Sequence, residues 1–424
     1  MSMKSDSSSS IKEAARGPGA RKSGTKTFQG FARRAGRAGI RNKVLLLPLD
    51  RYSNQIAWQV GQTAAGLTIL PCAGDMGRHA SDRERLFRIS SGMATNPNVY
   101  GVILFGLKPD FNYPEMRAER LLEVIRAAGR PVESIMASQA GGLGPAVLRG
   151  QEAARRMTRE ASRQSRTPVP LGDLAIGIKC GISDGTSGLS GNPALGAAVD
   201  RLIALGGATL FAETTEIIGA EHLLAQRAVN SEVGSRILRM AEECEQRALA
   251  VGEDIRSINP IPSNIKAGIS TLEEKSLGAV AKAGSAPLAG ALDYARQIPG
   301  PGLYFMDAWM ATNSLLPTLA ASGCQIVVLQ AGGGDMPQNP PMPAVNAGLV
   351  APVFFMTGNP QFARQVDLGL DFDSSGILDG SLSLAEAGKE LLQALAATAE
   401  GRLTWGETLR YVENLEIWFD GPCF

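Results

Sequence analysis

Short apolar runs alternate with amphipathic segments along most of the chain. In the first part, residues 43–49, 67–71, 99–107 and 131–137 are apolar and short enough to be strands. Segments with helical periodicity separate them, at residues 53–65, 82–94 and 113–128. Strands that alternate with helices form βαβ units, so this pattern predicts a parallel sheet covered by helices on both faces.

The second part repeats the pattern on a larger scale. Strands are predicted at residues 174–178, 208–212, 302–306, 325–329 and 351–356. Helices are predicted after Asn192-Pro193 and at residues 221–252, 272–282 and 384–398. The fold class is therefore α/β, with a parallel-sheet βαβ domain followed by a larger α/β domain.

Composition adds the boundaries between these parts. Residues 1–27 are rich in Ser, Gly, Lys and Arg and predict a disordered basic tail. Residues 28–140 predict a Rossmann-like domain and residues 171–424 the larger domain. Between them, residues 141–170 contain clustered glycines and a basic helix, which is typical of a linker.

Charge and cysteine content narrow the classes of partner. The formal net charge is +1, which gives no reason to expect a nucleic acid or an anionic membrane as partner. No uncharged apolar run approaches eighteen residues, so no transmembrane helix is expected. The five cysteines are scattered without a CxxC pair, which argues against a disulfide framework and a structural zinc site. We therefore expect a cytoplasmic protein.

Chemically reactive side chains are concentrated after two neighbouring strands of the second part. Lys179, Cys180, Ser183 and Asp184 follow residues 174–178 in a loop that also contains three glycines. Glu213 and Glu216 follow residues 208–212, and the next helix contains His222. Ligands of open α/β sheets bind outside the carboxyl ends of the strands, so these groups predict one crevice.

Candidate site residues of the second part also have ordinary structural interpretations. Asn192 before Pro193 is a typical helix start, and Lys275 can pair with neighbouring glutamates on a helix surface. Cys180 can be a small buried loop residue, and the glycines at 332–334 can form a tight turn or a carboxylate-binding one.

Five motifs occur in a characteristic order: KCGISDGTSGLSGNPALG at 179–196, ETTEIIGAEHLLAQRA at 213–228, NPIPSNIKAGISTLEEKSLG at 259–278, GLYFMDAWMATNS at 302–314 and DFDSSGIL at 371–378. With the opening segment FQGFARRAGRAGIRN at 28–42, the chain resembles the altronate/D-galactarate dehydratase family. The resemblance implies a lyase that depends on a divalent metal, Fe²⁺ above all, and removes water from a sugar acid to give a 2-keto-3-deoxy acid. It also implies a small β-rich domain or separate partner subunit, and an oligomer; a related branch eliminates sulfite from sulfolactate.

Elimination from a 2-hydroxy acid needs a base, a charge that binds the carboxylate, and an acid for the departing group. The expected catalytic residues are Lys179, Asp184, Glu213, His222 and Lys275. The expected substrate-binding residues are Ser183, Ser187, Asn192, Asn264 and Asp307. The expected metal ligands are Cys180 and Glu216.

The chain departs from the family pattern in the first domain. Tyr52 stands where a cysteine is typical, and the sequences PCAGDMG at 71–77 and GLKPD at 106–110 replace two further cysteine-containing turns. A glycine also replaces an arginine in the turn at 330–335. Three hypotheses therefore remain: a sugar-acid dehydratase, a sulfo-lyase, and a non-catalytic paralogue that binds a small carboxylate or acts as a regulatory subunit.

Overall fold

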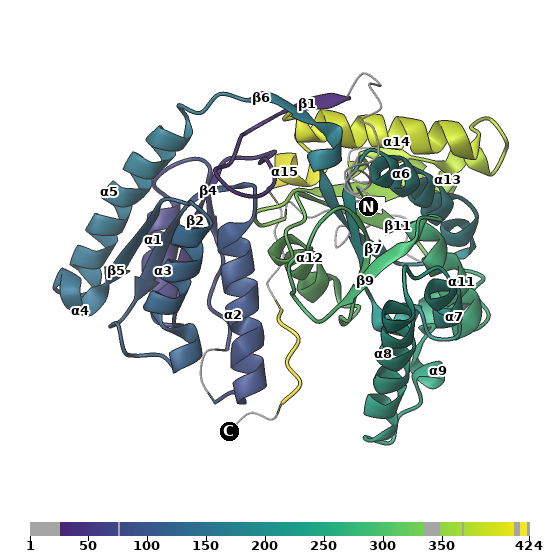
Figure 1. The fold of residues 1–424 in the computed structure, drawn as a ribbon, viewed down its shortest axis with the longest axis horizontal. Coiled ribbons are helices and arrows are strands. Elements are labelled where there is room, and N and C mark those ends of the chain that lie inside the picture. The colour runs from purple at the N-terminus through teal and green to yellow at the C-terminus, as the bar shows by residue number, and fades with distance from the viewer. Residues whose placement is uncertain (1–25, 75–76, 335–347, 367–368, 411–415, 422–424) are drawn as a thin grey trace, which may run out of the picture.

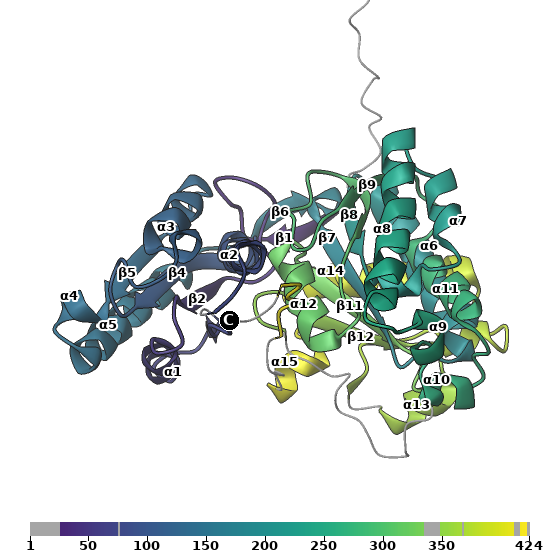
Figure 2. The same ribbon diagram turned by 90° about the horizontal axis from the view of Figure 1, so that it is seen from below.

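The computed structural model describes residues 26–74, 77–334, 348–366, 369–410 and 416–421. Two parallel sheets form the centres of two lobes, seen on the left and right of Figure 1 and Figure 2. The predicted α/β fold with two parallel sheets is thereby confirmed. The N-terminal tail lies outside the described residues up to residue 25.

The first sheet has the strand order β3-β2-β4-β5, and all its described pairs are parallel. Alternate side chains along each strand face opposite helical layers, because successive residues of a strand point to opposite faces. Helices α1 and α5 cover one face, and α2 and α3 cover the other. The elements are β2 (Lys43–Pro48), α1 (Asn54–Gly61), β3 (Leu67–Ile69), α2 (Ala80–Thr95), β4 (Val99–Gly106), α3 (Ala118–Ala127), β5 (Val132–Met136), α4 (Ala137–Ala140) and α5 (Leu143–Ala161).

The segment expected to be a linker belongs physically to both lobes. Helix α5 packs on the first sheet through Ala153 and Met157, which join the core formed by Val44 and Ile103. Strand β6 (Thr167–Pro170) then pairs antiparallel with β1 (Thr27–Gly30). The apolar stripe of α5 explains its packing, since a helix with one apolar face must bury it.

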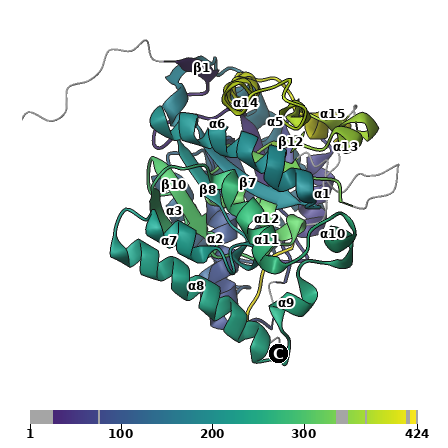
Figure 3. The ribbon, with the colours of Figure 1, turned by 90° about the vertical axis from the view of Figure 1, so that its right-hand side faces the viewer.

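The second sheet has the order β13-β12-β11-β7-β8-β10-β9, again with only parallel pairs among the described residues. Helices α6, α8 and α14 cover one face of this sheet, as Figure 3 shows, and α12 lies on the other. The strands are β7 (Ala175–Gly181), β8 (Ala208–Phe211), β9 (Leu288–Leu292), β10 (Gly302–Met306), β11 (Ile326–Ala331), β12 (Val353–Thr357) and β13 (Phe372–Asp373). The helices of the second part include α6 (Asn192–Ala204), α9 (Ile255–Ile258), α10 (Pro262–Lys266), α11 (Leu272–Val280), α12 (Thr312–Ala321), α13 (Pro360–Gln365), α14 (Leu384–Ala399) and α15 (Trp405–Leu409).

One expected helix is interrupted. The segment 221–252 forms α7 (Glu221–Gln226) and α8 (Ser231–Leu249) instead of one continuous helix. Asn230 ends the continuity because its side chain accepts a hydrogen bond from Val233 N and begins α8. Among the described residues, no helix is long and apolar enough to cross a membrane.

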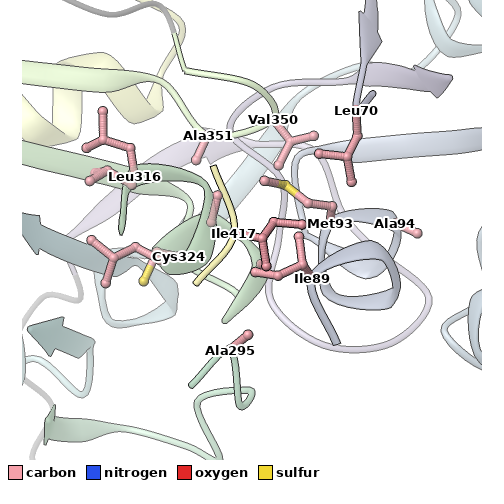
Figure 4. Close-up of a cluster of buried hydrophobic side chains, with 14 of the residues drawn as sticks. Leu70, Ile89, Met93, Ala94, Ala295, Leu316, Cys324, Val350, Ala351 and Ile417 are labelled. Carbon is pink, nitrogen blue, oxygen red and sulfur yellow. The ribbon is translucent and has the colours of Figure 1, made fainter. Parts of the chain in front are cut away.

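The two lobes share a continuous hydrophobic core. Figure 4 shows Ile89 and Met93 of α2 beside Ile417 and Val350, and Leu316 of α12 belongs to the same cluster. Buried amides add directed contacts: Asn96 donates to Ala320 O and Cys324 O, and Asn98 donates to Gln325 O and Val350 O, at 2.7–3.1 Å. Because buried polar groups must be hydrogen-bonded, these contacts fix how the lobes are oriented.

Candidate functional site

The candidate site lies at β7, where the order in which the chain adds strands to the second sheet reverses. Strand β7 is flanked by β8 on one side and β11 on the other, so the chain leaves β7 and later returns on its opposite edge. Lys179 and Cys180, near the end of β7, pair in register with Leu329 and Gln330 of β11. A change of strand order opens a crevice at the carboxyl ends, which is where ligands of such sheets bind.

Glu213 follows β8 in a left-handed conformation, with φ 81° and ψ 75°. Its carboxylate accepts from Lys179 Nζ, from Lys282 Nζ at 2.7 Å and from Cys180 N at 3.1 Å. A left-handed conformation is unfavourable for a residue with a side chain, so these three contacts must hold it in place. Such strain is concentrated at functional sites in proteins.

Glu216 extends these contacts into a cluster of buried charges. Its carboxylate lies 3.1 Å from Lys282 Nζ and 3.7 Å from Lys275 Nζ. Lys275 also donates to Asn259 Oδ1 at 2.7 Å and to Asn264 Oδ1 at 3.3 Å. We call Lys179, Lys275, Lys282, Glu213 and Glu216 the lysine–glutamate cluster; every member is at most 8% exposed. Three ammonium groups face two carboxylates, so the cluster has one excess positive charge.

The pKa values reflect this pairing. Burial alone would raise the pKa of Glu216, but Lys282, Lys275 and Lys179 outweigh it and lower the pKa to about 2. Burial would lower the pKa of Lys282, but Glu213 and Glu216 raise it above its usual value. Both groups are therefore charged at neutral pH, and neither is suited to exchange protons there.

A cavity of about 380 Å³ lies beside the cluster. Its size is within the range of small-molecule sites. Lys275 belongs to both, because its ammonium contacts the cluster and its side chain lines the cavity. The other polar residues that line the cavity, apart from Glu274, are Cys180, Ser183, Asp184, Ser187 and Asn192.

Asp184 organises the loop after β7. One carboxylate oxygen accepts from Thr186 N at 2.9 Å and from Thr186 Oγ1 at 2.6 Å, and the other accepts from Asn359 Nδ2 at 2.8 Å. Gly334 N lies 3.3 Å from the second oxygen, so the glycine turn at 332–334, for which a tight turn and a carboxylate-binding turn were both open, donates to the carboxylate of Asp184. The main role of these contacts is to fix the loop, which is the usual behaviour of an aspartate at a turn.

Cys180 is 1% exposed and lies between polar side chains. Its Sγ is 3.4 Å from Ser183 Oγ, 3.5 Å from Gln330 Oε1 and 3.9 Å from Asn192 Nδ2. Burial, followed by the negative charge of Glu216, raises the pKa of the thiol. Cys180 therefore stays protonated at neutral pH.

The residues expected to hold a metal do not fit a metal ion in the described part of the chain. The carboxylate of Glu216 is already bound by Lys282 and Lys275, and Cys180 has hydroxyl and amide neighbours. No group of three or more His, Cys, Asp and Glu side chains suited to a metal occurs among the described residues. Two lysine ammonium groups at a carboxylate oppose a cation, so Cys180 and Glu216 do not form a metal site here.

Most of the expected site residues converge, and two do not. Ser183, Ser187 and Asn192 line the cavity, and Asn264 supports the loop by donating to Ser183 O at 2.8 Å. His222 is exposed on α7 and does not line the cavity. Asp307 follows β10 and accepts from Thr214 Oγ1 at 2.5 Å, so it supports the turn that contains Glu213 and Glu216.

Three residues of the site were not predicted from the sequence. Lys282 binds both glutamates, Asn259 orients Lys275, and Gln330 contacts Cys180. Lys282 follows Lys275 by seven residues, which places both on one face of a helical segment, and this spacing was the available signal. The positions of Asn259 and Gln330 depend on the tertiary fold, and their local sequence contains no comparable signal.

Comparisons with known proteins identify the family of the chain. The profile described as D-galactarate dehydratase/Altronate hydrolase, second domain, matches residues 30–162. The profile described as D-galactarate/Altronate dehydratase, C-terminal, matches residues 171–422. The second match contains the whole candidate site.

Individual relatives are similar over most of the chain. The beta subunit of (2R)-sulfolactate sulfo-lyase from Chromohalobacter salexigens is 35% identical over 390 residues, which are 92% of this chain and 96% of that subunit. Altronate dehydratase from Bacillus subtilis is 32% identical, with 89% of this chain and 75% of that enzyme covered. Galactarate dehydratase (L-threo-forming) from Escherichia coli is 31% identical, with 74% and 59% covered. The chain therefore belongs to the D-galactarate/altronate dehydratase family.

Proposed function

We propose that this protein is a hydro-lyase that removes water from a sugar acid, such as altronate or galactarate, and yields a 2-keto-3-deoxy acid. One observation supports this most strongly: a buried cluster with one excess positive charge presents Lys275 to a cavity lined by hydroxyl, thiol and amide groups. A carboxylate is the natural partner of such a charge, and the polar lining suits the hydroxyl groups of a sugar acid.

The reaction can be assigned to three residues that line the cavity. Lys275 binds the substrate carboxylate and the negative charge that develops on it as the α-proton leaves. Asp184 accepts that proton, and Cys180, protonated because of its burial, donates one to the departing hydroxyl group. The C–H and C–O bonds break, water leaves, and the enol product becomes the 2-keto acid. A proton returns from Asp184 to Cys180 through solvent.

Lys282 acts through Glu216, and Glu213 acts by binding Lys282 and Lys179. Lys282 neutralises Glu216, and Glu216 in turn fixes the position of Lys275. Removing Lys282 would leave Glu216 with Lys275 alone, at 3.7 Å, and breaking a buried ion pair is costly.

The Fe²⁺ implied by the family resemblance stays a prediction, as does a cytoplasmic location. We also propose that the protein functions with a small partner subunit, because one relative is itself named a beta subunit. Metal analysis of anaerobically purified protein tests for Fe²⁺, and mass measurement of the native complex tests for the partner subunit.

A sulfo-lyase is the second candidate. The observation in its favour is the 35% identity to the sulfolactate sulfo-lyase beta subunit over 96% of its length. Such an enzyme would break a C–S bond where the hydro-lyase breaks a C–O bond, and the same carboxylate contact at Lys275 would serve both.

A substrate panel separates the candidates. Purified protein, with Fe²⁺ supplied, is incubated with altronate, galactarate and sulfolactate while 2-keto acid and sulfite are assayed. We expect 2-keto acid from a sugar acid, and we expect Lys275→Met to slow its formation roughly 10²–10³-fold while the exposed control Lys389→Met on α14 does not. Sulfite release would favour the second candidate. Ligand-induced thermal stabilisation without turnover would indicate a non-catalytic paralogue.

A further inference from the structure

Residues 416–421 connect the two lobes, and we call them the C-terminal segment. Figure 1 shows this segment in yellow between α2 of the first lobe and α12 of the second. Ile417 is buried in the core that both lobes share. Asp82 of α2 is fully buried and accepts hydrogen bonds from Asp420 N at 2.9 Å and Gly421 N at 2.8 Å. The segment is therefore fixed to the first lobe by directed contacts.

Trp418, in the middle of the C-terminal segment, contacts side chains of both lobes. The guanidinium carbon of Arg85 on α2 lies 4.5 Å from the centre of the indole ring, and that of Arg247 on α8 lies 5.3 Å from it. Tyr294, which follows β9, meets the ring edge-on at 5.5 Å, and its hydroxyl accepts from Trp418 N at 3.2 Å. A guanidinium group is attracted to the face of an indole ring. Trp418 therefore joins α2 to α8.

Arg247 continues this series of contacts to the acidic turn of the site, residues 213–216. Its guanidinium lies 3.6 Å from Asp307 Oδ1. The same oxygen accepts from Thr214 Oγ1 at 2.5 Å, and Thr214 N donates to Ala308 O at 3.2 Å. Thr214 is 1% exposed and belongs to the turn that presents both glutamates to the lysine–glutamate cluster. The contacts are thus continuous from Trp418 to this turn.

Two properties of the turn make these contacts important. Glu213 has a φ of 81°, so the conformation of the turn depends on contacts made from outside it. Burial raises the pKa of Asp307, and the hydrogen bond from Thr214 and the charges of Arg247 and Arg85 oppose that rise. The two arginines that face Trp418 therefore also favour the ionised form of Asp307, which is the stronger acceptor for Thr214.

We infer that the C-terminal segment positions the acidic turn of the site, and that Trp418 and Arg247 are the positioning residues through which it acts. Neither is among the described residues that line the cavity. Glu216 fixes the position of Lys275, so a displaced turn would move the ammonium group assigned to the substrate carboxylate. In this link to turnover the inference rests on the proposed function, and it extends the residues on which the reaction depends to the junction between the lobes.

Hydrogen–deuterium exchange of the intact protein tests the positioning role without substrate. We expect Trp418→Leu and Arg247→Met each to speed exchange of the backbone amides of residues 214–217 about three- to tenfold, because each removes an attraction that holds the turn. Trp418→Phe keeps an aromatic face and should exchange nearly as slowly as the wild type. Trp58→Leu, which changes an exposed tryptophan of α1, is the matched control and should leave these amides unchanged.

A double variant distinguishes one series of contacts from two separate supports. If Trp418 acts through Arg247, Trp418→Leu combined with Arg247→Met should exchange no faster than the stronger single variant. Additive effects would contradict the series. Unchanged exchange at residues 214–217 in Trp418→Leu would overturn the inference, and so would an increase spread evenly over the second lobe. If Trp418→Leu does not fold, unchanged exchange in Arg247→Met, whose side chain is 38% exposed, would overturn it equally.

Kinetics give a second readout, which separates the inference from the proposed function. In Trp418→Leu we expect kcat on a sugar acid to fall about tenfold with a smaller change in KM, because stabilisation of the developing charge depends on the exact position of Lys275. Faster exchange in a protein that converts no sugar acid would support the positioning role and count against the lyase. Turnover by a protein whose exchange and kcat are both unaffected by Trp418→Leu would support the lyase and overturn the positioning role.

Discussion

The two sheets of this protein have the same parallel architecture but use the polar residues at their strand ends differently. In the first sheet, Asp50 accepts hydrogen bonds from Ser53 N at 2.8 Å and Leu107 N at 3.0 Å, and Asn112 donates to Leu49 O. These side chains bind the backbone and close loops. In the second sheet, the charged side chains bind one another, and Lys275 lines a cavity.

The comparison teaches that polar residues at the carboxyl ends of strands do not by themselves identify a site. What distinguishes the second sheet is a group of ions that are buried together with unequal numbers of positive and negative charges. In the first sheet, Tyr52 stands where the family resemblance led us to expect a cysteine, and its ring packs edge-on against Phe111.

The largest effect is expected from Lys282→Met. This change removes the ammonium group that binds both Glu213 and Glu216 and leaves Glu216 with Lys275 alone, at 3.7 Å, and breaking a buried pair costs about 3–5 kcal/mol. We expect the free energy of unfolding in urea to fall by that amount. Lys282→Arg, which retains the charge, should lose less. A loss no larger than that of an exposed lysine variant would show that the cluster is not a stabilising unit.

Lys275→Met is expected to act on activity more than on folding. Removing a charge that stabilises the developing anion costs roughly 10²–10³-fold in kcat. Steady-state kinetics on the preferred sugar acid measures this, with the exposed Lys389→Met as control. A change in KM alone would mean that Lys275 binds the substrate and its transition state equally.

Glu216 should make stability depend on pH in the acid range. Its pKa in the folded protein is about 2, below the value of about 4.3 expected in an unfolded chain. The stabilisation is therefore complete above about pH 4.5 and is lost as the pH falls toward 2. In Glu216→Gln, the unfolding free energy should change less between about pH 4.5 and pH 2 than in the wild type, by roughly 2–3 kcal/mol. The surface variant Glu390→Gln serves as control.

The smallest effect on activity is expected in the first sheet. Asp50→Ala removes a buried acceptor of two backbone N–H groups and should cost about 1–3 kcal/mol of stability. Activity per folded molecule should remain unchanged, because Asp50 does not line the cavity. A drop in kcat at full folding would mean that the first sheet takes part in the reaction.

Much of the fold follows from local pattern. The apolar runs 99–107 and 302–306 appear as β4 and β10 within one residue, because continuous apolar runs between helical segments specify buried parallel strands. Helix α12 was not predicted: its residues 314–321 are all buried, and the periodic signal of an amphipathic helix is weak in a helix that is buried on all sides. Pro317 inside it also argues against a helix when only local rules are used.

Part of the site was predictable because it lies at the ends of strands that the sequence pattern locates. Lys179, Cys180 and Glu213 occupy strand ends, and strand ends can be read from the sequence. The pairing of Lys282 with Glu213 joins positions 69 residues apart, and such contacts come from sheet topology. His222 illustrates the converse, since its position after a strand suggested a site residue but α7 leaves it exposed.

The shared core between the lobes has a practical consequence for handling the protein. Leu47 and Leu104 of the first sheet belong to the same hydrophobic cluster as Met306 and Leu329 of the second. Dividing the gene near residue 165 would uncover this apolar surface on both fragments, which favours aggregation over independent folding. Recombinant expression of either half is thus expected to give insoluble material, and co-expression of the two halves to restore a soluble pair.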